Sequence, residues 1–161
     1  MVWKVSESTG NEAQKIMWET VPYTRGTGLD LGCGPAKVWP HAIGLDNKKE
    51  TALFGIEMQP DMVIPDAAKL PMFASQSMDW VFSSHLLEHM GNDVDALHEW
   101  WRVLRPGGHL MLYLPHKDLY PNTHGRDVWT KWYKEHKDDF HEDGPSGVKA
   151  YAVWRKSEGA E

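Results

Sequence analysis

The stretch Leu29-Asp30-Leu31-Gly32-Cys33-Gly34 decides the fold class of this chain. Its apolar residues predict a short buried strand over residues 27–31, and the glycines that follow predict a sharp turn. Such a turn lets a ligand approach the backbone where side chains would otherwise block it. Lys37 stands where a dinucleotide-binding fingerprint would have its third glycine. Asp30 disfavours a pyrophosphate ligand and suits one with an ammonium group, although a tight turn without any ligand is the alternative.

Strands and helices alternate along the rest of the chain. Further strands are predicted over residues 42–46, 62–64, 78–84, 109–114 and 148–154, and helices over residues 11–20 and 94–104. This order predicts an α/β fold, namely a three-layer α/β/α, Rossmann-like, doubly wound sheet. The sheet should be mostly parallel with an antiparallel C-terminal strand, in one domain over residues 1–161.

Several local features sharpen this expectation. Pro22 should end the first helix, and Pro106-Gly107-Gly108 should stop the second. Residues 35–41 are too few for a crossover helix, so a single turn or tight loop is expected there. Aromatic spacing predicts a helix over residues 127–140, which leaves only one strand after the fifth.

Composition excludes several classes of protein. Of the 161 residues, 41% are hydrophobic and 25% are charged, which is typical of a soluble globular chain. The formal net charge of −6 and the lack of a basic block argue against nucleic acid as the main partner. The longest apolar run is far too short for membrane insertion, and residues 1–10 lack a signal core. With Cys33 as the single cysteine, a cytoplasmic location is expected.

Acidic residues follow the next two predicted strands. Asp46 ends the second strand, where it would lie beside the glycine turn and could accept both hydroxyls of a ribose. Asp66-Ala67 follows the third strand, where a carboxylate could accept from an adenine amino group. Glycine, acid and acid at successive strand ends indicate a nucleoside laid across the carboxyl edge of the sheet.

These motifs resemble those of the class I S-adenosylmethionine (AdoMet)-dependent methyltransferases. The likeness covers roughly residues 26–116 and is most specific at Trp100-Trp101-Arg102-Val103-Leu104-Arg105-Pro106-Gly107-Gly108, before an apolar strand. The short first crossover and residues 114–121 resemble a subset found with polysaccharide and glycan biosynthesis enzymes. The resemblance implies that AdoMet is the cofactor and that the chain is a methyltransferase.

The resemblance also assigns roles to individual positions. It implies that the methionine moiety, the ribose, the adenine and the sulfonium of AdoMet each have their own contacts. The methionine moiety would be held by Asp30, Gly32 and Gly34, the ribose by Asp46, and the adenine by Asp66. The sulfonium would lie over Ser83, Ser84 and His85. Cys33, Asn47 and Ala67 are expected among the cofactor contacts as well.

The stretch His85-Leu86-Leu87-Glu88-His89 has a second interpretation. It matches the H-x-x-E-H signature of zinc peptidases, which requires both histidines on one long helix. Here it follows a buried strand directly, so no bound zinc is expected and a metal-dependent hydrolase is the minor alternative. The similar ubiquinone-type O-methyltransferases hold a divalent cation at this place, with His85 replacing their first acid. Glu88 and His89 could also simply cap and pack.

The methyl acceptor is expected to be a small molecule or a glycan-type compound, attacked at a hydroxyl. A hydroxyl needs a base, and His116 is slightly preferred over His89 because it directly follows the fifth strand. Because only one strand is expected after the fifth, a second copy or a partner subunit would complete the acceptor site. The same shortness leaves a non-catalytic AdoMet-binding module as an alternative.

Overall fold

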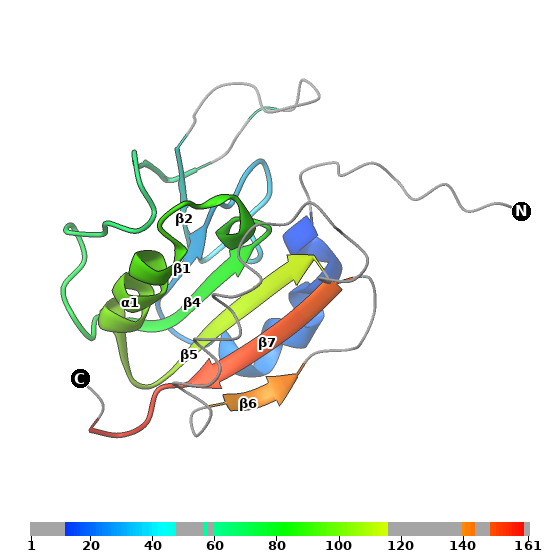
Figure 1. Ribbon diagram of the computed structural model, residues 1–161. Coiled ribbons are helices and arrows are strands. Elements are labelled where there is room, and N and C mark those ends of the chain that lie inside the picture. The colour runs from blue at the N-terminus through cyan, green and yellow to red at the C-terminus, as the bar shows by residue number, and fades with distance from the viewer. Residues whose placement is uncertain (1–11, 48–56, 58–59, 116–139, 144–148, 160–161) are drawn as a thin grey trace, which may run out of the picture.

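The computed structural model describes residues 12–47, 57, 60–115, 140–143 and 149–159 (Figure 1). Its centre is a sheet of seven strands in the order β3-β2-β1-β4-β5-β7-β6. The strands are β1 (Gly28–Leu31), β2 (Ile43–Asp46), β3 (Met62–Val63), β4 (Met78–Ser84), β5 (Leu104–Pro115), β6 (Phe140–Asp143) and β7 (Lys149–Arg155). Strands β1 to β5 pair in parallel, and β7 runs antiparallel to both β5 and β6. The α/β fold and its antiparallel C-terminal strand are confirmed.

In the part of the chain that the structure describes, an α-helix and a 3₁₀ helix cover opposite faces of the sheet, which gives three layers (Figure 1). The α-helix α1 (Asp93–Val103) buries Leu97 and Trp100 against one face. The 3₁₀ helix η1 (Glu12–Tyr23) buries Ala13 and Ile16 against the other. Side chains of β4 alternate between the two cores, because successive residues of a strand point to opposite faces. No helix in these ranges has both the length and the apolar character of a membrane span.

Two boundaries differ from the sequence expectation. Pro22 lies inside the last turn of η1, which ends at Tyr23. The hydroxyls of Thr20 and Thr24 donate to the Met17 and Thr20 carbonyls at this end, so local side chains satisfy backbone acceptors there. Helix α1 ends before Pro106, because β5 already begins at Leu104, where it pairs with Met78.

The expectation of a single strand after the fifth is wrong. The short strand β6 pairs with β7 and forms the edge of the sheet. Its sequence, Phe-His-Glu-Asp, is polar and does not alternate, which is how exposed edge strands avoid aggregation. Phe140 therefore belongs to a strand and not to a helix, while residues 127–139 lie outside the described ranges.

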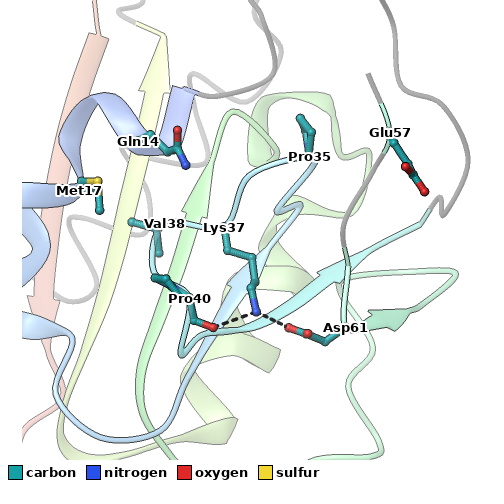
Figure 2. A pocket seen from close by; sticks show the side chains of 8 residues that line it. All are labelled: Gln14, Met17, Pro35, Lys37, Val38, Pro40, Glu57 and Asp61. Atoms are coloured by element: carbon teal, nitrogen blue, oxygen red, sulfur yellow. Dashed lines mark hydrogen bonds and ion pairs between the residues drawn. The ribbon is translucent and has the colours of Figure 1, made fainter. Parts of the chain in front are cut away.

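The first crossover contains only turns and bends over residues 32–42, as the sequence predicted. This loop contains no helix, and Lys37 stabilises it. Its ammonium donates to the Pro40 carbonyl at 3.0 Å and to Asp61 Oδ2 at 2.8 Å (Figure 2). It also donates to the Ala42 carbonyl at 2.9 Å. The same Asp61 oxygen accepts from the Gly44 N–H at 2.8 Å. Lys37, which stands in place of the third glycine of the dinucleotide fingerprint, thus stabilises the short loop between β1 and β2.

The Lys37→Met variant should be less stable than the wild type by about 1–3 kcal/mol, because two carbonyls and a carboxylate lose their donor. The hydrogen bond from Lys37 also lowers the pKa of Asp61. Urea denaturation measures the change in unfolding free energy. Lys69→Met is the control, since the Lys69 side chain is 79% exposed and its ammonium lies 3.9 Å from Asp66 Oδ2, and it should cost no more than about 1 kcal/mol. Equal effects of the two variants would show that Lys37 does not hold the loop.

Candidate active site at the carboxyl edge of the sheet

The turn after β1 is built by two glycines with left-handed backbone conformation. Gly32 has φ +69° and Gly34 has φ +56°, values that residues with side chains resist. The N–H groups of Gly32 and Cys33 donate to the Leu45 carbonyl at 2.8 and 3.2 Å. A Cβ atom on Gly32 would lie 3.1 Å from the side chain of Leu86. The turn therefore lies between the end of β2 and the segment after β4.

Asp46, the last residue of β2, contacts this turn directly. Its Oδ2 accepts from the Gly34 N–H at 3.0 Å, and its Oδ1 accepts from the Asn47 N–H at 2.8 Å. An ionised carboxylate has about four acceptor positions, so each oxygen can still accept from a hydroxyl. The structure thus brings together the glycine turn and the acid that the sequence placed at one edge.

Asp30 lies within β1 and is only 1% exposed. Its Oδ2 accepts from the Val38 N–H at 2.6 Å and so braces the crossover loop. Its Oδ1 is buried without a hydrogen-bond partner in the described part of the chain. Burial raises the pKa of Asp30 to about 7, against the lowering effects of the Val38 N–H and the Lys37 ammonium. An acid in this state is suited to a ligand that brings its own positive charge.

Asp66 follows β3 at the same edge and is already engaged within the chain. Its Oδ1 accepts from the Ala68 N–H at 2.9 Å. The amide of Asn92 donates to both carboxylate oxygens at 3.3 and 3.2 Å. Ala67 is fixed by its carbonyl, which accepts from the indole N–H of Trp100 at 2.8 Å. Contact of Asp66 with an adenine would add to these bonds or displace the Asn92 amide.

The sequence stretch that gave the most specific resemblance is a scaffold for this edge. Arg102 donates to the carbonyls of Leu70 and Phe73, and its side chain is paired with Glu99 at 2.8 Å. Glu99 also accepts from the Leu70 N–H, and the Arg102 hydrogen bond lowers the pKa of its carboxyl group. Helix α1 thereby holds the segment that carries Asp66.

Polar side chains are buried where β4 ends. Ser83, Ser84 and His85 all have a buried polar atom without a hydrogen-bond partner within the described ranges. His85 has φ +52°, which is rare for a residue other than glycine. Glu88, which belongs to the H-x-x-E-H stretch, is also buried and lies beside His85. In the sequence, the position of Glu88 in a motif at the end of a buried strand was the signal that could have indicated a functional role.

The remaining predicted residues are placed as follows. Cys33 is buried, and burial raises the pKa of its thiol to about 12, so it is not a thiolate nucleophile. The side chain of His89 is 75% exposed, and His116 lies outside the described residues. Within those residues no group of three or more His, Cys, Asp or Glu side chains is arranged to hold a metal ion.

A separate pocket of about 600 Å³ lies between the start of η1 and the crossover loop (Figure 2). Gln14, Pro35 and Lys37 are among its lining residues, together with Asp61. Pro35 directly follows the glycine turn, so the pocket adjoins the candidate site on the face where a crossover helix would otherwise stand.

Comparison with known proteins identifies the family. The family model described as a methyltransferase domain matches residues 29–112, which is more than half of the chain. The sequence matches no curated protein significantly.

Solved structures share the fold at low sequence identity. A Thermotoga maritima protein, described as a possible histamine N-methyltransferase, is 16% identical, with a TM-score of 0.64 over 92% of this chain and 91% of its own. A Pyrococcus horikoshii protein is 16% identical, with a TM-score of 0.67 over 91% and 89%. A third match comes from the Haloferax volcanii complex between the Trm112 methyltransferase activator and a putative methyltransferase. The matched chain is 16% identical, with a TM-score of 0.58 over 92% of this chain and 94% of its own.

The matched family model agrees with the function that the glycine turn and the acids at successive strand ends indicate. The chain belongs to the methyltransferase domain family and is an S-adenosylmethionine-dependent methyltransferase.

Proposed function

We propose that this chain binds AdoMet across the carboxyl ends of β1, β2 and β4 and transfers its methyl group to a hydroxyl of a small-molecule or glycan-type acceptor. The observation that carries the proposal is the buried, unpartnered Oδ1 of Asp30 beside a glycine turn that Asp46 contacts. The family model ends at residue 112, but β7 joins the same sheet. We therefore include the whole chain, residues 1–161, in one domain.

The residues at this edge fit the cofactor. AdoMet carries an ammonium group, which suits Asp30, and a ribose diol, which suits the free acceptor positions of Asp46. Gly32, Cys33 and Gly34 offer backbone close to the methionine moiety, and Asn47 adjoins the ribose position. Asp66 and Ala67 are proposed for the adenine. Ser83, Ser84 and His85 supply buried polar atoms for the region of the sulfonium.

Methyl transfer requires little covalent chemistry from the protein. Bound AdoMet supplies a methyl group already activated by the sulfonium. The chain must hold donor and acceptor in line and, for a hydroxyl, accept its proton. A rigid sheet edge braced by Lys37 and Arg102 suits the first task, because positioned groups lower the entropic part of the barrier.

The acceptor and the assembly state belong to the proposal as well. Hydroxyl-bearing sugars, lipids and phenols form the screening set, with release of S-adenosylhomocysteine as the readout. We also propose that a second copy or a partner subunit completes the acceptor site. Support comes from a protein of similar fold that forms a complex with the Trm112 methyltransferase activator. Light scattering of the purified chain measures whether it self-associates.

Two observations weigh against the alternatives. A non-catalytic module was favoured by the expectation that only one strand follows the fifth, but β6 is present beside β7. For a zinc hydrolase, His85 and His89 would need to share one helical face, whereas η3 (Leu87–His89) is a single 3₁₀ turn that begins after His85.

Asp46→Ala should weaken binding of AdoMet and of S-adenosylhomocysteine at least about tenfold, because hydrogen bonds from ribose hydroxyls to a carboxylate are lost. Titration calorimetry measures both affinities. Asp79→Ala is the matched control: Asp79 also accepts from a backbone N–H, that of Thr27, but lies at the amino end of β4. Unchanged affinity in Asp46→Ala would remove Asp46 from the site. Tighter binding of NAD than of AdoMet would overturn the cofactor assignment.

A further inference from the structure

The end of β4 concentrates buried polar atoms that lack hydrogen-bond partners. Within the described ranges these include Ser83 Oγ, Ser84 Oγ, His85 Nε2 and both carboxylate oxygens of Glu88. Leaving a buried polar atom without a partner costs about 1–3 kcal/mol. Five such atoms lie within six residues, so this segment lowers the stability of the fold. Such a cost is expected at a functional site.

The backbone and ring of His85 are held in one place. Its N–H donates to the Tyr113 carbonyl at 2.9 Å. Its ring meets the Tyr113 ring edge to face, with centroids 5.4 Å apart. Its φ of +52° is a strained value that the surrounding contacts must maintain. The imidazole thus stands at the carboxyl end of β4, next in sequence to the two buried serine hydroxyls.

Glu88 lies beside Nδ1 of this imidazole. The residue is only 6% exposed, and its Oε1 lies 3.4 Å from His85 Nδ1. The same oxygen lies 3.8 Å from Nε2 of the exposed His89. The contact with His85 has ion-pair distance without hydrogen-bond alignment, and catalytic contacts of this kind tighten when substrates bind. A carboxylate at Nδ1 favours the tautomer with a proton on Nδ1, which leaves Nε2 as the acceptor.

We propose that His85 is the general base for the hydroxyl acceptor and that Glu88 is its positioning residue. This inference rests on the proposed function. In the step, the acceptor oxygen forms a bond to the methyl carbon as the carbon–sulfur bond breaks, and the electron pair of that bond stays on sulfur. The hydroxyl proton passes to His85 Nε2, and the resulting imidazolium is stabilised by the Glu88 carboxylate.

The tautomer of His85 is the first test, and it needs no acceptor. Long-range proton–nitrogen correlation spectra near pH 8.5, where an ordinary imidazole is neutral, should show His85 protonated on Nδ1. His41 is the internal control, because its Nε2 lies 3.0 Å from the Thr24 carbonyl and must carry the proton. Adding S-adenosylhomocysteine should shift the His85 Nε2 resonance and leave that of His41 in place. A wild-type His85 protonated on Nε2 would overturn the inference.

Glu88→Met separates positioning from packing. Replacing a buried polar group that lacks hydrogen-bond partners with an apolar side chain of similar size is often neutral or stabilising. The variant should therefore unfold at the same or a higher urea concentration, while His85 shifts to the Nε2-protonated tautomer. A destabilised Glu88→Met variant that keeps the Nδ1 tautomer would assign Glu88 a structural role only.

Turnover completes the test, with the hydroxyl acceptor that releases most S-adenosylhomocysteine in the screen. His85→Asn is the informative variant, because asparagine tolerates the left-handed conformation at this position. It should lower kcat about a hundredfold to ten-thousandfold. Glu88→Met, which leaves the proposed AdoMet contacts in place, should lower kcat about tenfold to a hundredfold, with AdoMet affinity within about twofold of wild type. Full turnover by His85→Asn, with loss in His116→Ala or His89→Asn, would move the base to that histidine. Failure of the wild type to bind AdoMet would instead overturn the proposed function.

Discussion

Gly34→Val is expected to abolish detectable binding of AdoMet and S-adenosylhomocysteine while the chain remains folded. Gly34 has φ +56°, and a β-branched residue is strongly disfavoured in that region. Its N–H donates to Asp46 Oδ2, so any shift of the turn also moves the proposed ribose ligand. A valine side chain would in addition occupy volume beside the backbone that the cofactor must approach. Calorimetry measures binding, and circular dichroism measures folding.

The matched control for this variant is Gly91→Val. Gly91 lies in the loop before α1, and a Cβ atom there would meet nothing within 4 Å. Its φ is not in the left-handed region, so valine brings neither strain nor a clash. This variant should bind AdoMet as the wild type does. If Gly34→Val also binds normally and is folded, the turn after β1 serves only the fold.

The central parallel strands β1 and β4 could be predicted because they are buried on both faces. Such strands appear in a sequence as continuous apolar runs, and β4 was predicted with the observed bounds, Met78–Ser84. The amphipathic spacing of α1 placed that helix to within one residue at each end. The edge strand β6 could not be found in this way, because a short strand of charged residues has no periodic signal.

The meeting of the glycine turn and Asp46 could also be predicted, because parallel strands end at the same edge of a sheet. What the sequence could not show was the role of residues whose contacts depend on the path of the folded chain. Lys37 appeared as a departure from a motif, yet it binds Asp61 across the loop. Glu88 appeared as part of a possible metal signature, yet its burial beside His85 depends on how the chain leaves β4.

Asp30 should make the protein less stable as the pH rises, which is the reverse of the usual behaviour of an acid. Its pKa in the folded chain is about 7, against an ordinary value of 3.8. The folded state therefore binds more protons than the unfolded state between these two values. The stability contribution is fully present below about pH 3.8 and is lost as the pH rises through about 7. The total loss is about 4 kcal/mol, because one pKa unit corresponds to about 1.4 kcal/mol.

Asp30→Asn isolates this contribution from that of the other titrating groups. Asparagine has nearly the same shape and can still accept from the Val38 N–H through its carbonyl oxygen. Urea denaturation at pH 5 and pH 8 should show the wild type losing about 3 kcal/mol more stability than Asp30→Asn over that interval. Equal losses in the two proteins would mean that Asp30 is ionised throughout this range.

The same acid should make cofactor affinity depend on pH. An ammonium group beside Oδ1 requires the ionised carboxylate, so below about pH 7 binding must release a proton. The affinity for S-adenosylhomocysteine should then fall up to about tenfold for each pH unit below 7 and stay constant above it, and Asp30→Asn should bind weakly at every pH. Methylthioadenosine is the control ligand, because it keeps the nucleoside and the thioether but lacks the ammonium group. If methylthioadenosine shows the same pH dependence, the titrating acid acts on the nucleoside, and Asp30 does not hold the methionine moiety.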